Sequence, residues 1–243
     1  MAKYRIAELL IEIEAHYGLT YEHCRDYLVE TDEAPDFRVS VTEEEIAATH
    51  ADFADHSLAY AEKYAIFRRI ADQAAERGAI LFHAAAVEVN GEAYAFAAPS
   101  GTGKSTHILL WRKLFGARVG IINGDKPFLR LKNGVLTVYG SPFCGKEGWH
   151  KNVSAPLKGL CFLSRAQENT IKRITDEREL LSRVFAQMLK TSTAEGVSET
   201  LRFADLLIQT VPIYALGCNI SPEAAALSFG TMTGMGSFPE EHS

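Results

Sequence analysis

A glycine-rich turn in the middle of the chain constrains its fold more than any other sequence feature. Residues 98–106 read Ala-Pro-Ser-Gly-Thr-Gly-Lys-Ser-Thr, between an apolar segment typical of a strand (92–97) and a segment with one apolar helix face (105–115). Gly101 and Gly103 permit backbone conformations that turn consecutive N–H groups inward around an anion. The helix that follows directs the positive end of its dipole at the same place. This combination predicts a phosphate-binding loop.

Within this loop each residue type has a chemical role. Lys104 supplies a full positive charge that can reach β- and γ-phosphates, and the Ser105 hydroxyl lies where a magnesium ligand is needed. The usual pattern opens with glycine where this chain has Ala98, but that position closes the strand, and a small residue can serve there. The alternative is an ordinary glycine turn with Lys104 in solvent. The predicted phosphate-binding residues are Ser100, Gly101, Thr102, Gly103, Lys104, Ser105 and Thr106.

The composition argues against several other classes of protein. The chain has 243 residues, a formal net charge of −6 and no polybasic run, which argues against a duplex nucleic-acid partner. Its start has no signal-type apolar segment, and no apolar run approaches the roughly 18 to 20 residues that span a bilayer. The widely spaced cysteines favour reduced thiols over disulfides or a zinc site, and they are Cys24, Cys144, Cys161 and Cys218. We therefore expect a cytoplasmic protein without a membrane partner.

Hydrophobic patterning divides the chain into three parts. Residues 1–78 contain short alternating strands and two helical patterns, and they predict a small α+β lead-in. Within this part, Thr42 and Glu45 form a capping-box signature at the start of a helix. Residues 79–230 alternate strands with helices and predict an α/β nucleotide-binding domain. The final part, residues 231–243, is expected to be a frayed tail.

Two Asn-Gly pairs punctuate the predicted nucleotide-binding domain. Asn90-Gly91 and Asn133-Gly134 are each flanked by β-compatible residues and predict tight hairpins. The first hairpin would join strands at 80–89 and 92–97. Further strands are predicted at 118–122, 157–163, 170–174 and 211–216, helices at 176–189, 195–209 and 222–228, and a long loop at 140–152.

Two residues outside the loop are candidates for the metal or for catalysis. Asp125 follows an apolar strand about twenty residues after the loop, where a second acidic motif is expected in a phosphoryl-transfer site. The alternative for Asp125 is a turn-forming Gly-Asp pair. His83 lies in the strand before the loop-bearing one, and an isolated histidine in an apolar strand is more often a core residue than a ligand.

Two further segments could supply groups that contact a substrate. The loop at 140–152 contains Lys146 and Glu147 in a glycine-punctuated stretch, and long loops near nucleotide sites often carry substrate groups. Arg165, at the end of a predicted strand, could offer a guanidinium to phosphate. For all three residues, an ordinary solvated surface charge is the alternative.

Taken together, these motifs resemble a known group of enzymes. "HAAAV", the first hairpin, "APSGTGKST" and "INGDKP" are similar to the catalytic domain shared by bacterial HPr kinase/phosphorylase and ATP-dependent phosphoenolpyruvate carboxykinase. Small HPr-kinase-like proteins also show segments similar to "YGSPFCGKEGW" and "VPIYALGCNISPEAA". The resemblance covers about residues 80–225. It implies a P-loop in a mixed α/β fold, with a β-sheet core and flanking helices, and it implies a functional or metal-binding role for His83.

The chain departs from this group at one position. The group has two adjacent aspartates at the second motif, the first acting as base and the second as metal ligand, whereas this chain has Gly124-Asp125-Lys126. Matching the Lys-Pro that follows puts Asp125 at the metal position and leaves Gly124 at the position of the base. A shift of one residue would instead keep the base and replace the metal ligand with Lys126. In either alignment one carboxylate is missing.

These observations give one leading hypothesis and two alternatives. The resemblance implies an ATP-dependent kinase that uses Mg²⁺ or Mn²⁺ and transfers the γ-phosphoryl group to a hydroxyl, expected to be a serine of a small protein or peptide. Ser105, Asp125 and His83 would hold the metal, and Lys104, Asp125 and His83 would act in catalysis. The first alternative is an ATP-binding protein with weak or no transfer activity. The second is a carboxykinase-type enzyme, although the Arg and Lys groups for a dicarboxylate are not evident. An oligomer is expected only from the resemblance, because the chain has no coiled-coil seam.

Overall fold

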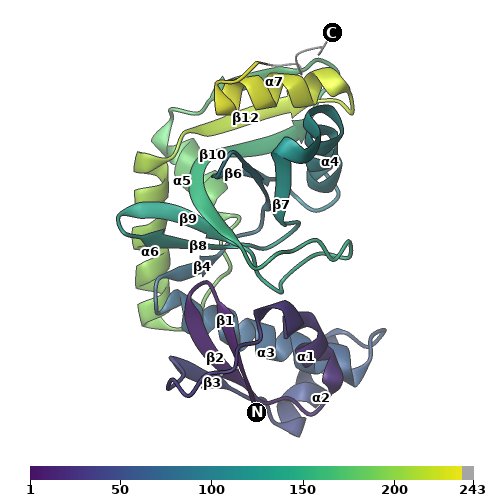
Figure 1. Cartoon of the computed structure of the whole chain (residues 1–243), viewed down its shortest axis with the longest axis vertical. Coiled ribbons are helices and arrows are strands. Elements are labelled where there is room, and N and C mark those ends of the chain that lie inside the picture. The colour runs from purple at the N-terminus through teal and green to yellow at the C-terminus, as the bar shows by residue number, and fades with distance from the viewer. Residues whose placement is uncertain (237–243) are drawn as a thin grey trace.

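The N-terminal part of the chain is a three-stranded sheet covered by helices, at the lower end of the molecule in Figure 1. The structure is a computed structural model that describes residues 1–236. β1 (Ala2–Ile6) and β2 (Leu9–Ile13) are antiparallel, and β3 (Phe37–Val39) runs parallel to β2. The helical elements are α1 (Gly18–Cys24), the 3-10 turn η1 (Arg25–Tyr27), α2 (Glu43–Asp52) and α3 (Leu58–Ala75).

The following part of the described chain is built on a nine-stranded mixed sheet. β10 (Ser154–Arg165) is parallel to β6 (Glu92–Ala97) and β12 (Ile213–Cys218), and it is antiparallel to β9 (Val135–Tyr139). The first residues of β10 pair with β9 and its last residues with β12, so the sheet curls along this long strand (Figure 1). The remaining strands are β4 (Ala79–Leu81), β5 (Ala85–Val89), β7 (Val119–Asn123), β8 (Phe128–Lys132) and β11 (Thr170–Arg173).

Alternate residues of β6 belong to two different hydrophobic cores, because successive side chains of a strand point to opposite faces. Tyr94 and Phe96 lie in the core that contains Trp111 and Phe229, from two helices on one side of the sheet. The alanines of β6 lie in the core that contains Leu207, on the other side. The strand that carries the glycine-rich loop is therefore buried on both faces. The flanking helices are α4 (Lys104–Phe115), α5 (Glu177–Phe185), α6 (Ala194–Thr210) and α7 (Pro222–Thr233).

The predicted mixed α/β class with flanking helices is confirmed, and so are both Asn-Gly hairpins. Asn90 and Asn133 have φ of 52° and 49°, and each is followed by a glycine with φ of 81°. Positive φ at both central residues is what a two-residue type I′ hairpin requires. The predicted capping box is also present: the Thr42 side chain accepts from the Glu45 backbone N–H, and the Glu45 carboxylate accepts from the N–H of Thr42.

Residues 80–89, predicted as one strand, form two separate strands. β4 pairs with β8, whereas β5 pairs with β6 and β7. In the break between them, the N–H of Phe82 donates to the carbonyl of Pro127, and the N–H of His83 donates to that of Gln187. His83 therefore lies in the short connection between β4 and β5 and not within a strand, which corrects its predicted placement. The run is apolar throughout because both strands are buried, so its periodicity does not reveal the break.

Three other differences concern helices. α1 was not predicted from the sequence, and no side chain of the flanking residues caps it; instead Glu62 of α3 accepts the N–H groups of His16 and Tyr17 at 2.6 and 2.9 Å. The helix predicted at 176–189 ends at Phe185. The helix predicted at 222–228 continues to Thr233, so the first residues of the expected tail are helical. Residues 237–243 of that tail lie outside the described residues.

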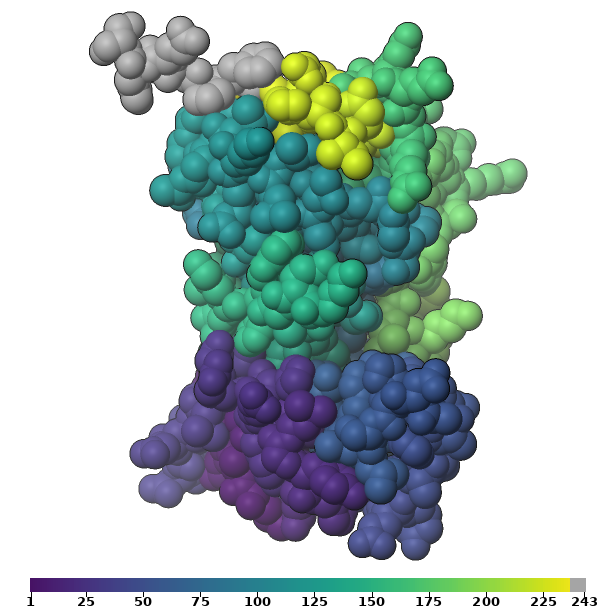
Figure 2. Space-filling view, turned by 90° about the vertical axis from the view of Figure 1, so that its right-hand side faces the viewer, coloured from purple at the N-terminus to yellow at the C-terminus, as the bar shows by residue number. Residues whose placement is uncertain are grey.

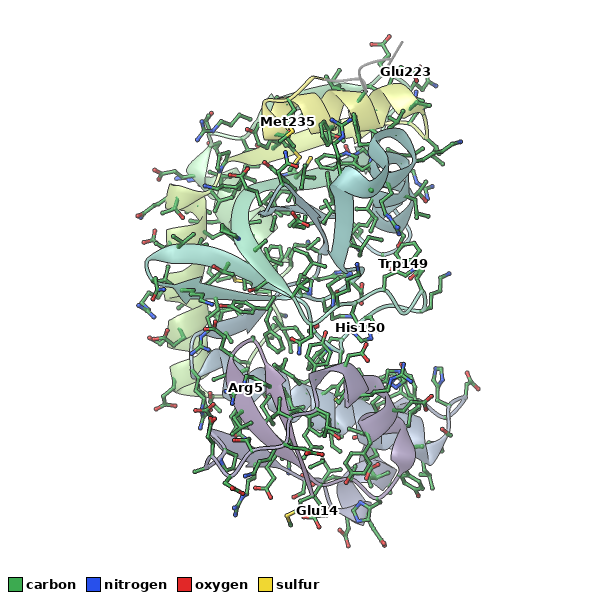
Figure 3. All side chains as sticks on the ribbon, viewed as in Figure 1. Arg5, Glu14, Trp149, His150, Glu223 and Met235 are labelled. Carbon is green, nitrogen blue, oxygen red and sulfur yellow. The ribbon has the colours of Figure 1, made fainter. Side chains whose placement is uncertain are left out.

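The long loop at 140–152 returns from the large sheet to the N-terminal part. Its two ends meet where the N–H of Gly140 donates to the carbonyl of Val153 at 2.9 Å. His150 stacks on Tyr27, with ring centroids 5.7 Å apart, and its Nδ1 lies 3.2 Å from the tyrosine hydroxyl. Figure 3 shows His150 at the junction of the two parts, with Trp149 beside it. The loop therefore contacts both parts of the molecule.

Candidate functional site

The loop between β6 and α4 has the backbone of an anion-binding turn. Gly101 and Gly103 have φ of 75° and 118°, in the left-handed region that residues with a side chain rarely adopt. Around either glycine, no described atom beyond the chain neighbours lies within 4 Å of an added Cβ, so conformation and not space requires glycine there. Gly103 is the N-cap of α4, and it brings no side chain to cap the helix. The N–H groups of the first turn are therefore available to an anion.

Lys104 is folded into the site and does not extend into solvent. Its Nζ donates to the carbonyl of Ala98 at 3.0 Å and lies 3.0 Å from Nε2 of His83. The side chain is buried, and this burial lowers the pKa of the ammonium, an effect that the nearby Asp125 carboxylate opposes. Ala98 thus holds the lysine through its backbone carbonyl. Any residue at this position offers that carbonyl, so alanine in place of the usual glycine does not remove this contact.

His83 and Asp125 join Lys104 in one polar cluster. Oδ1 of Asp125 lies 3.3 Å from Nε2 of His83, and its Oδ2 lies 2.5 Å from Nζ of Lys126. Burial alone would raise the pKa of Asp125, but the hydrogen bonds and charges of His83 and Lys126 outweigh it and hold this pKa well below its usual range. Nε2 of His83 can accept from Lys104 or donate to Asp125, but not both at once.

A buried asparagine sets the position of Asp125. Oδ1 of Asn123 accepts the N–H groups of Asp125 and Lys126, each at 2.8 Å. Its Nδ2 donates to the carbonyl and hydroxyl oxygens of Ser141 at 2.9 and 3.1 Å. Asn123 and Ser141 are fully buried and were not among the predicted site residues. The Asn-Gly-Asp sequence is a turn signal that could have drawn attention to Asn123, whereas no sequence signal points to Ser141.

The donor set at the loop suits a magnesium ion only together with phosphate oxygens. Among the described residues, no three His, Cys, Asp or Glu side chains gather to hold a metal ion. Asp125 offers one carboxylate beside the loop, and Ser105 offers a hydroxyl in the first turn of α4. Mg²⁺ usually binds through one or two carboxylates, waters and substrate phosphates, so this donor set fits a magnesium–nucleotide complex. His83 stands next to Asp125 as a further donor.

The space beside Gly124 is filled by Trp149. A Cβ at Gly124 would lie 3.3 Å from Cβ of Trp149 and 3.5 Å from its Cε3. The N–H of Gly124 also donates to the carbonyl of Trp149 at 2.8 Å. Gly124 has no positive φ, so an aspartate there is compatible with the backbone, although Trp149 must shift by a few tenths of an ångström. The loop at 140–152 thus packs directly against Gly124.

Lys146 and Glu147, in the same loop, are both exposed side chains. Both Oε2 of Glu147 and Cβ of Asp125 lie close to the position of a Cβ on Gly145, at 3.1 and 3.4 Å. The Glu147 carboxylate and Asp125 are therefore near neighbours across Gly145. Of the two predicted substrate residues in this loop, only Glu147 lies by Asp125.

Arg165 and a large cavity lie on the other side of the loop. The Arg165 guanidinium donates to the carbonyl of Gly101 at 2.6 Å, which joins the end of β10 to the glycine-rich turn. A cavity of about 480 Å³ opens beside this contact, between the start of α4 and the ends of β10 and β12. Its lining includes Thr102, Thr106 and the highly exposed Ile220. This volume is in the range of sites that bind small molecules.

The chain was compared with protein families, curated proteins and solved structures. No protein-family model and no curated protein matches the chain. Among solved structures, the HPr(Ser) kinase/phosphatase from Coxiella burnetii aligns with a TM-score of 0.30 and 9% sequence identity, over 53% of this chain and 88% of that chain. Across residues 1–236, no helix combines the length and apolar character needed to cross a membrane.

Proposed function

We propose that this protein binds ATP with Mg²⁺ or Mn²⁺ at residues 98–106 and transfers the γ-phosphoryl group to a hydroxyl, with serine of a small protein or peptide as the expected acceptor. The observation that carries this proposal is the cluster at the loop. At the N-terminus of a helix without a side-chain cap, Nε2 of His83 lies 3.0 Å from the Lys104 ammonium and 3.3 Å from the Asp125 carboxylate. Positive charge, a metal ligand and free N–H groups are what a triphosphate requires.

Different residues of the site would bind different parts of the nucleotide. The N–H groups of the glycine-rich turn and the first turn of α4 bind the phosphates, and Lys104 neutralises charge on the β- and γ-phosphates. Ser105 and Asp125 would hold the metal ion, with His83 as a further ligand or an orienting group. When bound, the metal would neutralise charge on the phosphates. The cavity beside Arg165 is large enough for the nucleoside.

The transfer also needs a group that takes the proton of the acceptor. The acceptor oxygen forms a bond to the γ-phosphorus, the bond from that phosphorus to the bridging oxygen breaks, and ADP leaves with the electron pair. A general base works best with a pKa near the operating pH, so the strongly lowered pKa of Asp125 favours a metal ligand over a base. We infer that Glu147 takes the proton, because its carboxylate and Asp125 both border Gly145, and Nε2 of His83 is already engaged.

One observation favours the alternative of an ATP-binding protein without transfer activity. Gly124 lacks the carboxylate that the resembling enzymes have, and Trp149 packs closely against it. The two functions differ in a measurable way, since only the kinase needs Glu147.

We expect the Glu147→Gln substitution to lower phosphoryl transfer about 100-fold, the size typical for loss of a general base, and to leave the Kd for Mg·ATP within about twofold. Transfer from [γ-³²P]ATP to a pool of serine peptides measures the rate, and calorimetry measures the Kd. Lys146→Met in the same loop is the matched control and should retain the wild-type rate.

A second pair of variants tests the alternative. The double variant Gly124→Asp with Trp149→Ala adds a carboxylate and removes the side chain that would crowd it. The double variant Gly124→Asn with Trp149→Ala supplies a side chain of the same shape without the charge. Activity in the aspartate variant alone, with an inert wild type, would replace the kinase proposal by the ATP-binding alternative.

A further inference from the structure

A second cavity lies between α3 and the loop at 140–152, beside Lys126. Its volume is about 190 Å³, and Lys63, Phe67 and Arg68 of α3 line it together with Phe143 and Lys126. In Figure 2 the blue surface of α3 and its neighbours lies below the green surface that includes this loop. The cavity is therefore built from segments of both parts of the chain.

The charged groups of this cavity are all cationic. Lys63, Arg68 and Lys126 line it with His23, and no Asp or Glu is among the lining residues, although the whole chain has a net charge of −6. Within residues 1–236, neither Lys63 nor Arg68 has a carboxylate within ion-pair distance, whereas Lys126 pairs with Asp125. Lys63 and Arg68 thus bring two cations without a carboxylate partner to one cavity, and an anion bound there would be attracted to both.

Lys63 is the cation most in need of a partner. Its Nζ lies 3.3 Å from Nε2 of His23 and 4.8 Å from the ring centroid of Tyr60. The side chain is half-buried, and this burial lowers the pKa of the ammonium. A partly desolvated ammonium that meets rings and no carboxylate in the described residues gains more from an incoming anion than a solvated one does.

The walls of the cavity are largely aromatic. The rings of Phe67 and Phe143 contact each other with centroids 4.5 Å apart, and Phe143 also meets Phe128 edge to face. Tyr60 and Tyr64 add further aromatic surface. A cavity of this size and lining fits a single apolar or aromatic group that bears a negative charge.

The cavity adjoins the reacting groups through Lys126. This residue lines the cavity, and its Nζ lies 2.5 Å from Oδ2 of Asp125. A molecule bound in the cavity would thus be separated from Asp125 by one side chain. We propose that the cavity holds a carboxylate on an aromatic or apolar body, belonging to the acceptor whose hydroxyl receives the phosphoryl group. This assignment rests on the proposed function, and it makes α3 part of acceptor recognition.

The binding test uses benzoate as the probe and benzamide as its neutral isostere. Titrations followed by NMR, without nucleotide, should show that benzoate binds at least 10-fold more tightly than benzamide. Lys63→Met keeps the length of the side chain and should abolish this difference; Arg68→Met, at an exposed position, should reduce it even if the Lys63 variant folds poorly. Lys172→Met, on exposed β11, is the control and should preserve it. Equal binding of benzoate and benzamide to the wild type would overturn the proposal.

The acceptor role is tested separately from the kinase itself. Benzoate should inhibit transfer to the serine-peptide pool competitively with the peptide and not with ATP, and Lys63→Met should leave the Kd for Mg·ATP within about twofold of wild type. Inhibition that is competitive with ATP, or no inhibition at saturating benzoate, would refute the acceptor role. A wild type that transfers no phosphate would contradict the proposed function, and the carboxylate site would then be decided by the benzoate titration alone.

Discussion

Replacing Lys104 with methionine should weaken Mg·ATP binding by about 100-fold, which corresponds to about 2.7 kcal/mol. The substitution removes the one full positive charge that the loop itself directs at the phosphates, and a hydrogen bond to a charged group contributes about 1.5 to 3 kcal/mol. Methionine keeps the length and burial of the side chain, so the loop should keep its backbone. Calorimetric titration of the wild type and the variant measures the effect.

A matched variant separates this effect from a general loss of charge. Lys113 lies in the last turn of the same helix, away from the glycine-rich turn, so Lys113→Met should bind Mg·ATP as the wild type does. Thermal melting of the Lys104 variant checks that it is folded. Equal affinity in wild type and Lys104→Met, with both folded, would contradict the assignment of the loop.

The Gly140→Ala substitution should destabilise the protein by about 3 kcal/mol or more, at the upper end of single-residue effects. A Cβ at Gly140 would stand 1.7 Å from the carbonyl oxygen of Lys151 and 3.1 Å from that of Ile122. Both contacts are backbone atoms, which cannot move aside as the end of a side chain can. The two ends of the loop at 140–152 would separate, and this loop also carries Trp149 and Glu147.

Urea unfolding of Gly140→Ala against Gly18→Ala measures this effect. Around Gly18 the described structure leaves the space for a Cβ open and φ is not positive, so alanine there should change the free energy of unfolding by less than about 1 kcal/mol. Similar free energies of unfolding for the two variants would show that the loop does not close at Gly140 as described.

Local sequence signals predicted those parts of the fold that depend on local chemistry. The Asn-Gly hairpins require positive φ at two adjacent residues, and only a few residue types supply it. The capping box at Thr42 and the strand, turn and helix around Gly101 also depend on residues that are close together in the sequence. These elements needed no knowledge of the tertiary structure.

Features that depend on distant segments were not predictable in the same way. The break at His83 arises because β4 and β5 pair with different strands, which an apolar run of residues does not reveal. α1 begins where Glu62, from another helix, accepts backbone N–H groups. The cationic cavity is formed by Lys63 and Lys126, which the sequence separates widely.

Gly124 shows what structure adds to a sequence departure. The sequence reports only that a carboxylate is missing there, and it leaves open which residue takes its place. In the structure, Trp149 packs closely against Gly124, and Glu147 and Asp125 both border Gly145 of the same loop. Whether the protein transfers phosphate is therefore tested best by substitutions in the loop at 140–152.

The central claim is that the nucleotide phosphates bind between the glycine-rich turn and Asp125. Hydrogen–deuterium exchange with the non-hydrolysable analogue Mg·AMP-PNP tests it directly, because the amides at an uncapped helix start exchange readily until a ligand accepts them. The account predicts slower exchange at residues 98–107 and 123–126 in the wild type, and none of this protection in Lys104→Met. Unchanged exchange in both segments of the wild type at saturating nucleotide, or protection confined to other segments, would contradict it.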